Sequence, residues 1–192
     1  MHKKLIAFIQ AYSLTSLTDK DITAIHKAFI PKKLRKRQFL LQEGEVCKCY
    51  GFIISGAVRQ YTIDERGVEH TLSLAIENWW AGDRDSYFRE QPSIYNIDAC
   101  EETDLLLISR EGLDRLLSIP AFVEMRIKLD ENHSIASQKR LLSYISMNAE
   151  QRYADLLKSH PQFIERFPSR IIASYLGITK ETLSRVRRYS KR

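Results

Sequence analysis

The spacing of apolar residues divides the chain into a helical beginning, a middle of short strands and a helical end. Residues 2–12 and 19–29 repeat apolar side chains every three or four positions, as one face of an amphipathic helix does. Thr18 or Asp19 suits the N-cap of the second helix, and Pro31 blocks its continuation. We therefore predict two helices before the first strand.

The middle of the chain has a shorter period, and turn residues separate its apolar runs. The strand-like runs are residues 39–41, 50–54, 57–61, 72–75 and 103–108. Many short strands at this spacing, without alternating helices, indicate an antiparallel jelly-roll barrel rather than a parallel α/β sheet. The basic run at 32–37 is interpreted as a solvated approach to the first strand.

Residues after Ser109 return to helical spacing. A short helix is expected over 110–118, and Pro120 then opens a stretch of helix formers that reaches about Met147. A polar interruption at 132–134 divides its apolar seam, whose members are Phe122, Met125, Leu129, Leu141, Leu142 and Ile145. Such a helix packs on its own barrel or pairs two chains, and a polar spot can fix the register of a dimer. We favour dimerisation.

A helix-turn-helix is indicated close to the end of the sequence. Ala173 is small enough for a second helix to cross closely, and Gly177 suits the left-handed conformation that ends the first helix. Thr179 is a good N-cap for the second helix, whose Leu183 and Val186 face the core. Because these signals occur together, an ordinary helical hairpin with a basic tail is the weaker interpretation.

The outer face of the second helix carries the candidate DNA contacts. A recognition helix places its N-terminal residues at base edges, so we predict base contacts by Lys180, Glu181 and Arg185. Arginine bonds bidentately to guanine, and a glutamate accepts from the cytosine amino group. The predicted phosphate contacts are Ser169, Arg170, Thr179, Thr182, Ser184 and Arg188.

The charge of the chain is concentrated in the same segment. From Arg166 onward there are eight basic residues and one acidic residue, a net charge of +7, whereas the first 165 residues have a net charge of −1. A concentrated positive charge is what a polyanionic partner requires, although a solubilising tail would also be basic.

The predicted helix-turn-helix resembles the signature of the Crp/Fnr family of transcription regulators, most closely over residues 172–185. Shorter barrel segments at 42–45, 54–56 and 104–109 are similar as well. The resemblance implies an α+β fold in three parts. They are a cyclic-nucleotide-binding-like sensor domain with a jelly-roll barrel (1–118), a dimerisation helix (119–147) and a winged helix-turn-helix DNA-binding domain (148–192). Because only four residues follow Arg188, we expect the β-wing to be reduced.

A departure from the family lies where its cyclic-AMP-binding members carry a Gly-Glu and, about ten residues later, an Arg-Ser pair. This chain has Gly82-Asp83 there, and Ser93 or a neighbour stands in place of the arginine. A cyclic phosphate needs a cation or a nest of amides, so we expect neither cyclic AMP nor another cofactor. The candidate effector pocket comprises Trp79, Trp80, Asp83, Ser93 and Asn96, although closure of the barrel end is the favoured interpretation of the two tryptophans.

Other chemistry finds little support. Cys47, Cys49 and Cys100 are expected to be buried or incidental thiols, with redox sensing and metal binding as the alternatives. A cupin-type metalloenzyme needs clustered histidines, but His70 is the only histidine between residues 34 and 108. The first helix lacks the long apolar core of a signal peptide, which favours a cytoplasmic protein that does not enter a membrane.

The sequence therefore predicts a DNA-binding transcription regulator without enzymatic activity. It would act as a homodimer on a roughly palindromic site in double-stranded DNA, with an unidentified small effector and RNA polymerase as further partners. The alternative is a ligand-sensing module whose helical tail binds a protein instead of DNA.

Overall fold

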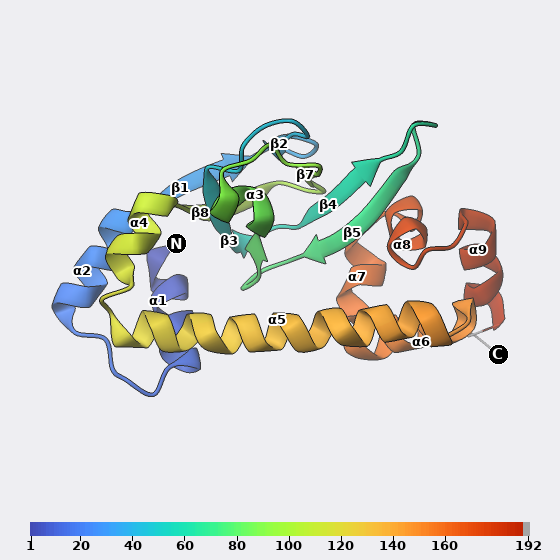
Figure 1. Ribbon diagram of the computed structural model, residues 1–192. Coiled ribbons are helices and arrows are strands. Elements are labelled where there is room, and N and C mark those ends of the chain that lie inside the picture. The colour runs from blue at the N-terminus through green and yellow to red at the C-terminus, as the bar shows by residue number, and fades with distance from the viewer. Residues whose placement is uncertain (190–192) are drawn as a thin grey trace. The chain divides into compact units, whose positions relative to one another are not determined.

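The computed structural model describes residues 1–189 and divides into two compact units (Figure 1). The first unit comprises residues 1–60 and 75–132, and the second comprises residues 61–74 together with the chain from residue 133 onward. The division into 1–118, 119–147 and 148–192 stays a prediction.

Two helices begin the first unit, as predicted. They are α1 (His2–Tyr12) and α2 (Asp19–Ala28). Thr18 is the N-cap of α2 and forms a capping box with Asp21, in which each side chain bonds the backbone N–H of the other residue.

The first sheet is antiparallel and has the order β1-β8-β3-β6. Its strands are β1 (Phe29–Leu34), β8 (Thr103–Ser109), β3 (Cys49–Ser55) and β6 (Trp80–Ala81). The prediction of helix to residue 29 was one residue too long, because Phe29 already pairs with Ile108. Pro31 lies within β1, which tolerates it because β1 is an edge strand.

The second sheet has the order β2-β7-β4-β5. Its strands are β2 (Phe39–Leu41), β7 (Asn96–Ala99), β4 (Val58–Ile63) and β5 (Glu69–Ala75). The two four-stranded sheets form a jelly-roll-like fold, without a closed barrel among the described strands. The sequence did not predict β1, β6 and β7, nor the six-residue helix α3 (Arg84–Arg89).

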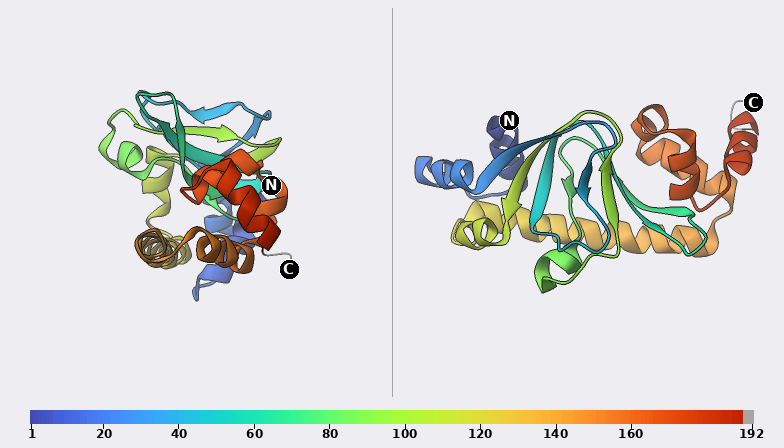
Figure 2. Two further views of the ribbon diagram at one scale, coloured as in Figure 1. Left: turned by 90° about the vertical axis from the view of Figure 1, so that its right-hand side faces the viewer. Right: turned by 90° about the horizontal axis from the view of Figure 1, so that it is seen from above.

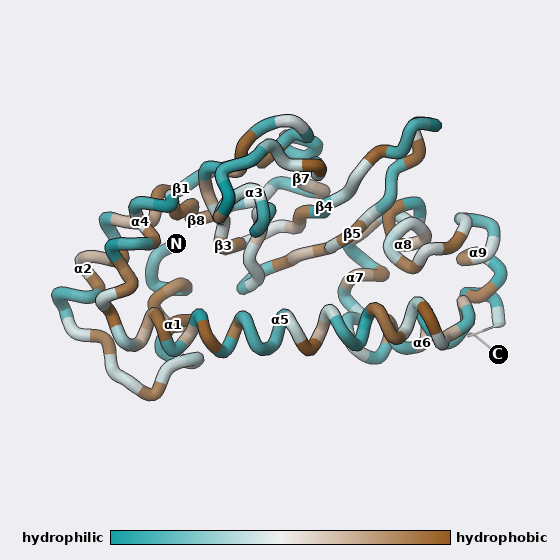
Figure 3. Tube along the Cα trace, in the orientation of Figure 1, coloured by the Kyte–Doolittle hydropathy of each residue, from teal (hydrophilic) through white to brown (hydrophobic). Residues whose placement is uncertain are grey.

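Helices α4 (Arg110–Leu116) and α5 (Pro120–Ser146) follow the last strand, close to the predicted bounds. Helix α5 is one unbroken helix, seen along its length in Figure 1 and in the right-hand view of Figure 2. Its first turns are buried in the first unit through Phe122 and Met125. Hydrophobic residues recur farther along it (Figure 3), and there they are exposed: Leu141 by 61%, Leu142 by 60% and Ile145 by 75%.

Four short helices complete the second unit. They are α6 (Ala149–Ser159), α7 (Pro161–Arg166), α8 (Ser169–Tyr175) and α9 (Lys180–Tyr189). Their shared core contains Tyr153, Leu156, Phe163, Ile172, Leu183 and Val186. No strand occurs between residues 110 and 189, so this described segment has no β-wing. Among residues 1–189, no helix is both long enough and apolar enough to span a membrane.

Candidate functional site

The turn between α8 and α9 has the predicted glycine geometry. Gly177 has a φ of +65°, which lies in the left-handed region that glycine adopts without strain. The Ile178 N–H donates to the Ala173 carbonyl at 3.0 Å, and the Gly177 N–H donates to the Ser174 carbonyl at 3.0 Å. This pair of bonds is a Schellman motif, which satisfies the last carbonyls of α8 and fixes where α9 begins.

Thr179 caps α9, as the sequence predicts. The Thr182 N–H donates to Thr179 Oγ1 at 3.2 Å. Glu181 lies in the first turn of α9. Its pKa is lowered, chiefly by a hydrogen bond from its own backbone N–H and then by one from the Thr179 side chain. The Glu181 carboxylate is therefore ionised at neutral pH and acts only as a hydrogen-bond acceptor.

The exposed face of α9 carries the predicted base-contacting residues. Lys180, Glu181 and Arg185 are exposed, as are Ser184 and Arg188 from the predicted phosphate set. Leu183 and Val186 are buried on the opposite side, so the helix has the amphipathic orientation that the sequence indicates. The contacts with DNA themselves stay a prediction.

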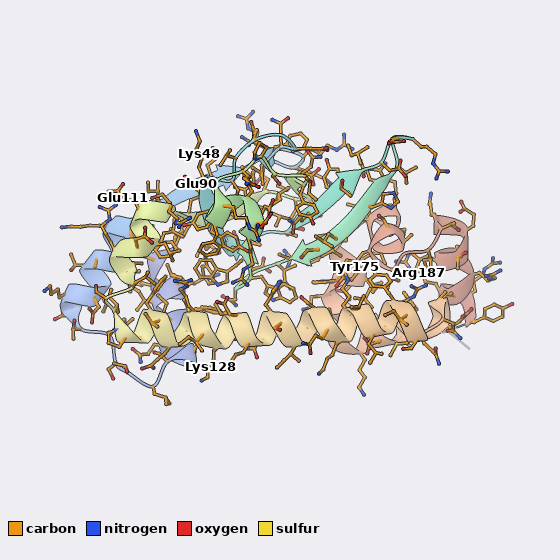
Figure 4. All side chains as sticks on the ribbon, viewed as in Figure 1. Lys48, Glu90, Glu111, Lys128, Tyr175 and Arg187 are labelled. Atoms are coloured by element: carbon orange, nitrogen blue, oxygen red, sulfur yellow. The ribbon has the colours of Figure 1, made fainter. Side chains whose placement is uncertain are left out.

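Arg187 is a site residue that the sequence did not single out. It is half-buried on α9, where Figure 4 labels it. Its Nη1 donates to Ser169 Oγ at 2.8 Å, joining α9 to the first residue of α8. Arg187 lies seven residues after Lys180, on the same side of α9, and this spacing could have identified it as a site residue from the sequence.

Two residues of α8 contact strand β5 within the second unit. Arg170, a predicted phosphate contact, lies 3.2 Å from the Glu69 carboxylate. Ser174 Oγ accepts from the Thr71 N–H at 2.8 Å and donates to the Glu69 carbonyl at 2.8 Å. The hairpin of β4 and β5 therefore holds α8 through backbone groups, which the sequence did not predict.

Arg140 of α5 strengthens the same junction. Its guanidinium lies 3.9 Å from the centre of the Tyr175 ring, and Nη2 donates to the Tyr175 carbonyl at 3.3 Å. Nη1 donates to the Leu72 carbonyl of β5. Tyr144 donates through its hydroxyl to the same Tyr175 carbonyl. One arginine thus connects α5, β5 and the end of α8, which Figure 4 marks at Tyr175.

The structure brings together only part of the candidate effector pocket. Ser93 Oγ donates to Asp83 Oδ2 at 2.7 Å, and both residues are buried. Asp83 also caps α3 by accepting from the Asp85 N–H at 3.0 Å. Asn96 bonds elsewhere, because its Oδ1 accepts from the Glu43 N–H at 3.1 Å.

The two tryptophans pack against the core of the first unit. The ring centre of Trp80 lies 5.2 Å from that of Phe52 and 6.1 Å from that of Phe29. Trp79 is also partly buried against this cluster. Both indoles therefore pack against the core, and their role as an effector pocket stays a prediction.

The cations nearest to Asp83 in sequence are ion-paired. Arg84 bonds Asp130 of α5, and Arg89 Nε lies 2.7 Å from Asp85 Oδ1. A cyclic phosphate at this place would meet the buried Asp83 carboxylate, while both guanidiniums are engaged with other carboxylates. The residues therefore do not fit the phosphate of a cyclic nucleotide.

The cysteines are free thiols. Cys47 and Cys100 are buried, and Cys49 is half-buried. Burial raises the pKa of all three thiols, that of Cys100 to about 12, so they are protonated and weakly nucleophilic at neutral pH. Within residues 1–189, no three histidine, cysteine or acidic side chains converge on a possible metal position.

Known proteins resemble this chain in both sequence and structure. A family model for the cyclic nucleotide-binding domain matches residues 31–119. The fumarate and nitrate reduction regulatory protein of Vibrio cholerae is 29% identical over 184 residues, which cover 89% of this chain and 73% of that protein. The anaerobic regulatory protein of Aggregatibacter actinomycetemcomitans is 28% identical over 170 residues, covering 81% of this chain and 64% of the relative.

The chain is therefore similar to regulators of the Crp/Fnr family. Among solved structures, FixK2 from Bradyrhizobium japonicum matches with a TM-score of 0.70 and 20% identity, covering 84% of this chain and 83% of FixK2. The catabolite activator protein of Thermus thermophilus matches with a TM-score of 0.56 and 20% identity, covering 90% and 83%. The chain spans slightly less than two thirds of the Aggregatibacter relative. The names of the Aggregatibacter and Vibrio proteins are those of regulators, not enzymes.

Proposed function

We propose that this protein is a transcription regulator that binds double-stranded DNA through α9. The observation that carries the proposal is the exposed face of α9, where Lys180, Arg185 and Arg188 stand beside the single acid Glu181. The Schellman turn and the Thr179 cap hold that face in place. A rigid cationic helix at the end of a helix-turn-helix suits the major groove.

Three side chains of α9 would recognise the DNA sequence. Arg185 donates two hydrogen bonds to a guanine, and Glu181 accepts from a cytosine amino group. Lys180 reaches a guanine or a neighbouring phosphate. Because Glu181 is ionised, the phosphates of DNA repel its carboxylate. A cytosine amino group that donates to the carboxylate offsets this repulsion, which makes Glu181 a residue for specificity.

We also propose that two chains pair through α5. The exposed Leu141, Leu142 and Ile145 form an apolar stripe on an unbroken helix, and a dimer would remove this stripe from water. A symmetric dimer presents two recognition helices roughly 34 Å apart, one turn of DNA, so the operator would be approximately palindromic.

The protein would also respond to an effector and contact the transcription machinery. The region around Asp83 and Ser93 does not hold a cyclic nucleotide, and any effector would be a different small molecule. RNA polymerase is the further partner, because the relatives are regulatory proteins. We also propose that the protein acts in the cytoplasm and catalyses no reaction.

Salt-dependent binding of duplex DNA tests this function. A fluorescent duplex of about 30 base pairs, long enough for two half-sites one turn apart, is titrated with the full chain at several salt concentrations. Binding is followed by anisotropy. If six or more phosphates are contacted, the affinity should fall by about a thousandfold between roughly 50 and 200 mM salt. Failure to bind any duplex at the lowest salt concentration would refute the proposal and favour a protein partner for the basic helices.

A further inference from the structure

A hollow of about 310 Å³ lies between the start of α8 and one side of α9. Its lining consists of Ser169, Lys180, Leu183, Ser184, Arg187 and Arg188. Three of these side chains are cationic and none is acidic. Leu183 is buried and forms an apolar floor, which reduces the access of water to the surrounding charges. This lining suits a small anion.

Arg187 is held in place before any ligand arrives. The bond from Nη1 to Ser169 Oγ fixes the guanidinium against α8, so little side-chain entropy remains to be lost on binding. Arg187 Nε is buried and has no hydrogen-bond partner among the described residues. A buried donor without an acceptor is costly, and an acceptor supplied by a ligand would remove that cost.

The remaining donors come from both helices. Ser169 accepts from Arg187, so its own hydroxyl hydrogen is free to donate to an anion. Lys180 and Ser184 lie seven and three residues before Arg187, which places them along the same side of α9. Arginine and lysine with two hydroxyls match the several acceptor oxygens of a phosphate group.

We propose that this hollow is the seat of one DNA backbone phosphate, gripped by Arg187 with help from Ser169 and Lys180. The inference rests on the proposed function. The hollow adjoins the exposed face that carries Arg185, and a helix in the major groove is flanked by the phosphates of the DNA backbone. The contact sets the position of α9 along the groove and reads no base. It provides an anchor in a chain whose described residues lack a wing.

The test compares the salt dependence of Arg187→Met with that of the full wild-type chain. Two duplexes are used, one carrying the sequence that the wild type selects from a random pool and one of unrelated sequence. Loss of one phosphate contact should reduce the slope of log affinity against log salt by about 0.9 and weaken binding by about tenfold. The ratio of the two affinities should stay unchanged, because a phosphate carries no sequence information.

The matched control is Arg115→Met, which removes one exposed arginine from α4, where it pairs with Glu111 at 3.7 Å. This control should keep the wild-type slope. Arg187→Lys should keep the slope but bind more weakly, since lysine lacks the guanidinium fork. If Arg187→Met does not fold, as judged by circular dichroism, Ser169→Ala replaces it and should weaken both duplexes by the same few-fold factor.

The outcomes separate this inference from the function on which it rests. A wild-type slope in Arg187→Met, or unchanged binding by Ser169→Ala, would overturn the phosphate seat and leave Arg187 a purely structural tether. A change in the ratio of the two duplex affinities in Arg187→Met, with the salt slope of the wild type, would also overturn it. If the wild type binds neither duplex, the proposed function fails and the inference fails with it.

Discussion

Asp83 and Ser93 form a buried hydrogen-bonded pair at the N-terminus of α3. Their 2.7 Å hydrogen bond lies inside the protein, and Asp83 uses a second acceptor at the N-terminus of α3. The carboxylate thus has its hydrogen-bond partners inside the protein. A ligand phosphate would have to replace these bonds and approach a like charge, which is unfavourable in a buried place.

From this geometry we predict that cyclic AMP does not bind. Titration calorimetry of the full chain with cyclic AMP up to millimolar concentration should show no saturable heat. The affinity for duplex DNA should also be the same with and without the nucleotide. Saturable binding, or a shift in DNA affinity, would mean that the region around Asp83 rearranges to provide a cation for the phosphate.

Helix α5 has different surroundings along its length. Its first turns bury Phe122 and Met125, whereas its last turns expose Leu141, Leu142 and Ile145. An apolar stripe on the exposed half of a long helix is typical of an interface between chains. Ala136 lies nine residues before Ile145, half a turn away around the helix, and is also exposed.

We therefore predict that Ile145→Asp converts the dimer into monomers. Burying one isoleucine is worth roughly 1.5–3 kcal/mol, and a dimer loses two of them, so dimerisation should weaken by at least about 100-fold. Sedimentation equilibrium measures this change. Ala136→Asp introduces the same charge on the opposite side of α5 and should leave the dimer intact; equal effects of the two substitutions would show that the stripe is not the interface.

Local signals made most elements predictable, and long-range contacts account for most of the rest. Thr18, Gly177 and Thr179 act on neighbouring residues, so their capping and turn roles could be predicted from the sequence. Strand β1 was missed because Pro31 suggests an end to structure, whereas its pairing partner β8 lies about 70 residues farther along the chain. Residue pattern alone gives no sign of such a partner.

The whole molecule combines a jelly-roll-like unit with a helix-turn-helix unit, and the sequence predicted both. It did not predict that the hairpin of β4 and β5 would belong with the C-terminal helices. The bonds of Ser174 to β5 join residues more than 100 positions apart, and they use backbone groups that every residue has. The exposed face of α9 was predictable because burial follows helical spacing, whereas the Arg187 bond to Ser169 depends on how α8 and α9 cross.

Selection of bound sequences from a random duplex pool, run in parallel with wild type and Arg185→Ala, tests the central claim most directly. The wild type should enrich an inverted repeat whose half-sites are centred about 10 base pairs apart and contain G·C pairs. Arg185→Ala should lose or relax the preference at one G·C position in each half-site, at a cost of about 1–3 kcal/mol. No enriched repeat from the wild type, or the same motif from both proteins, would contradict the account of α9 as the recognition helix.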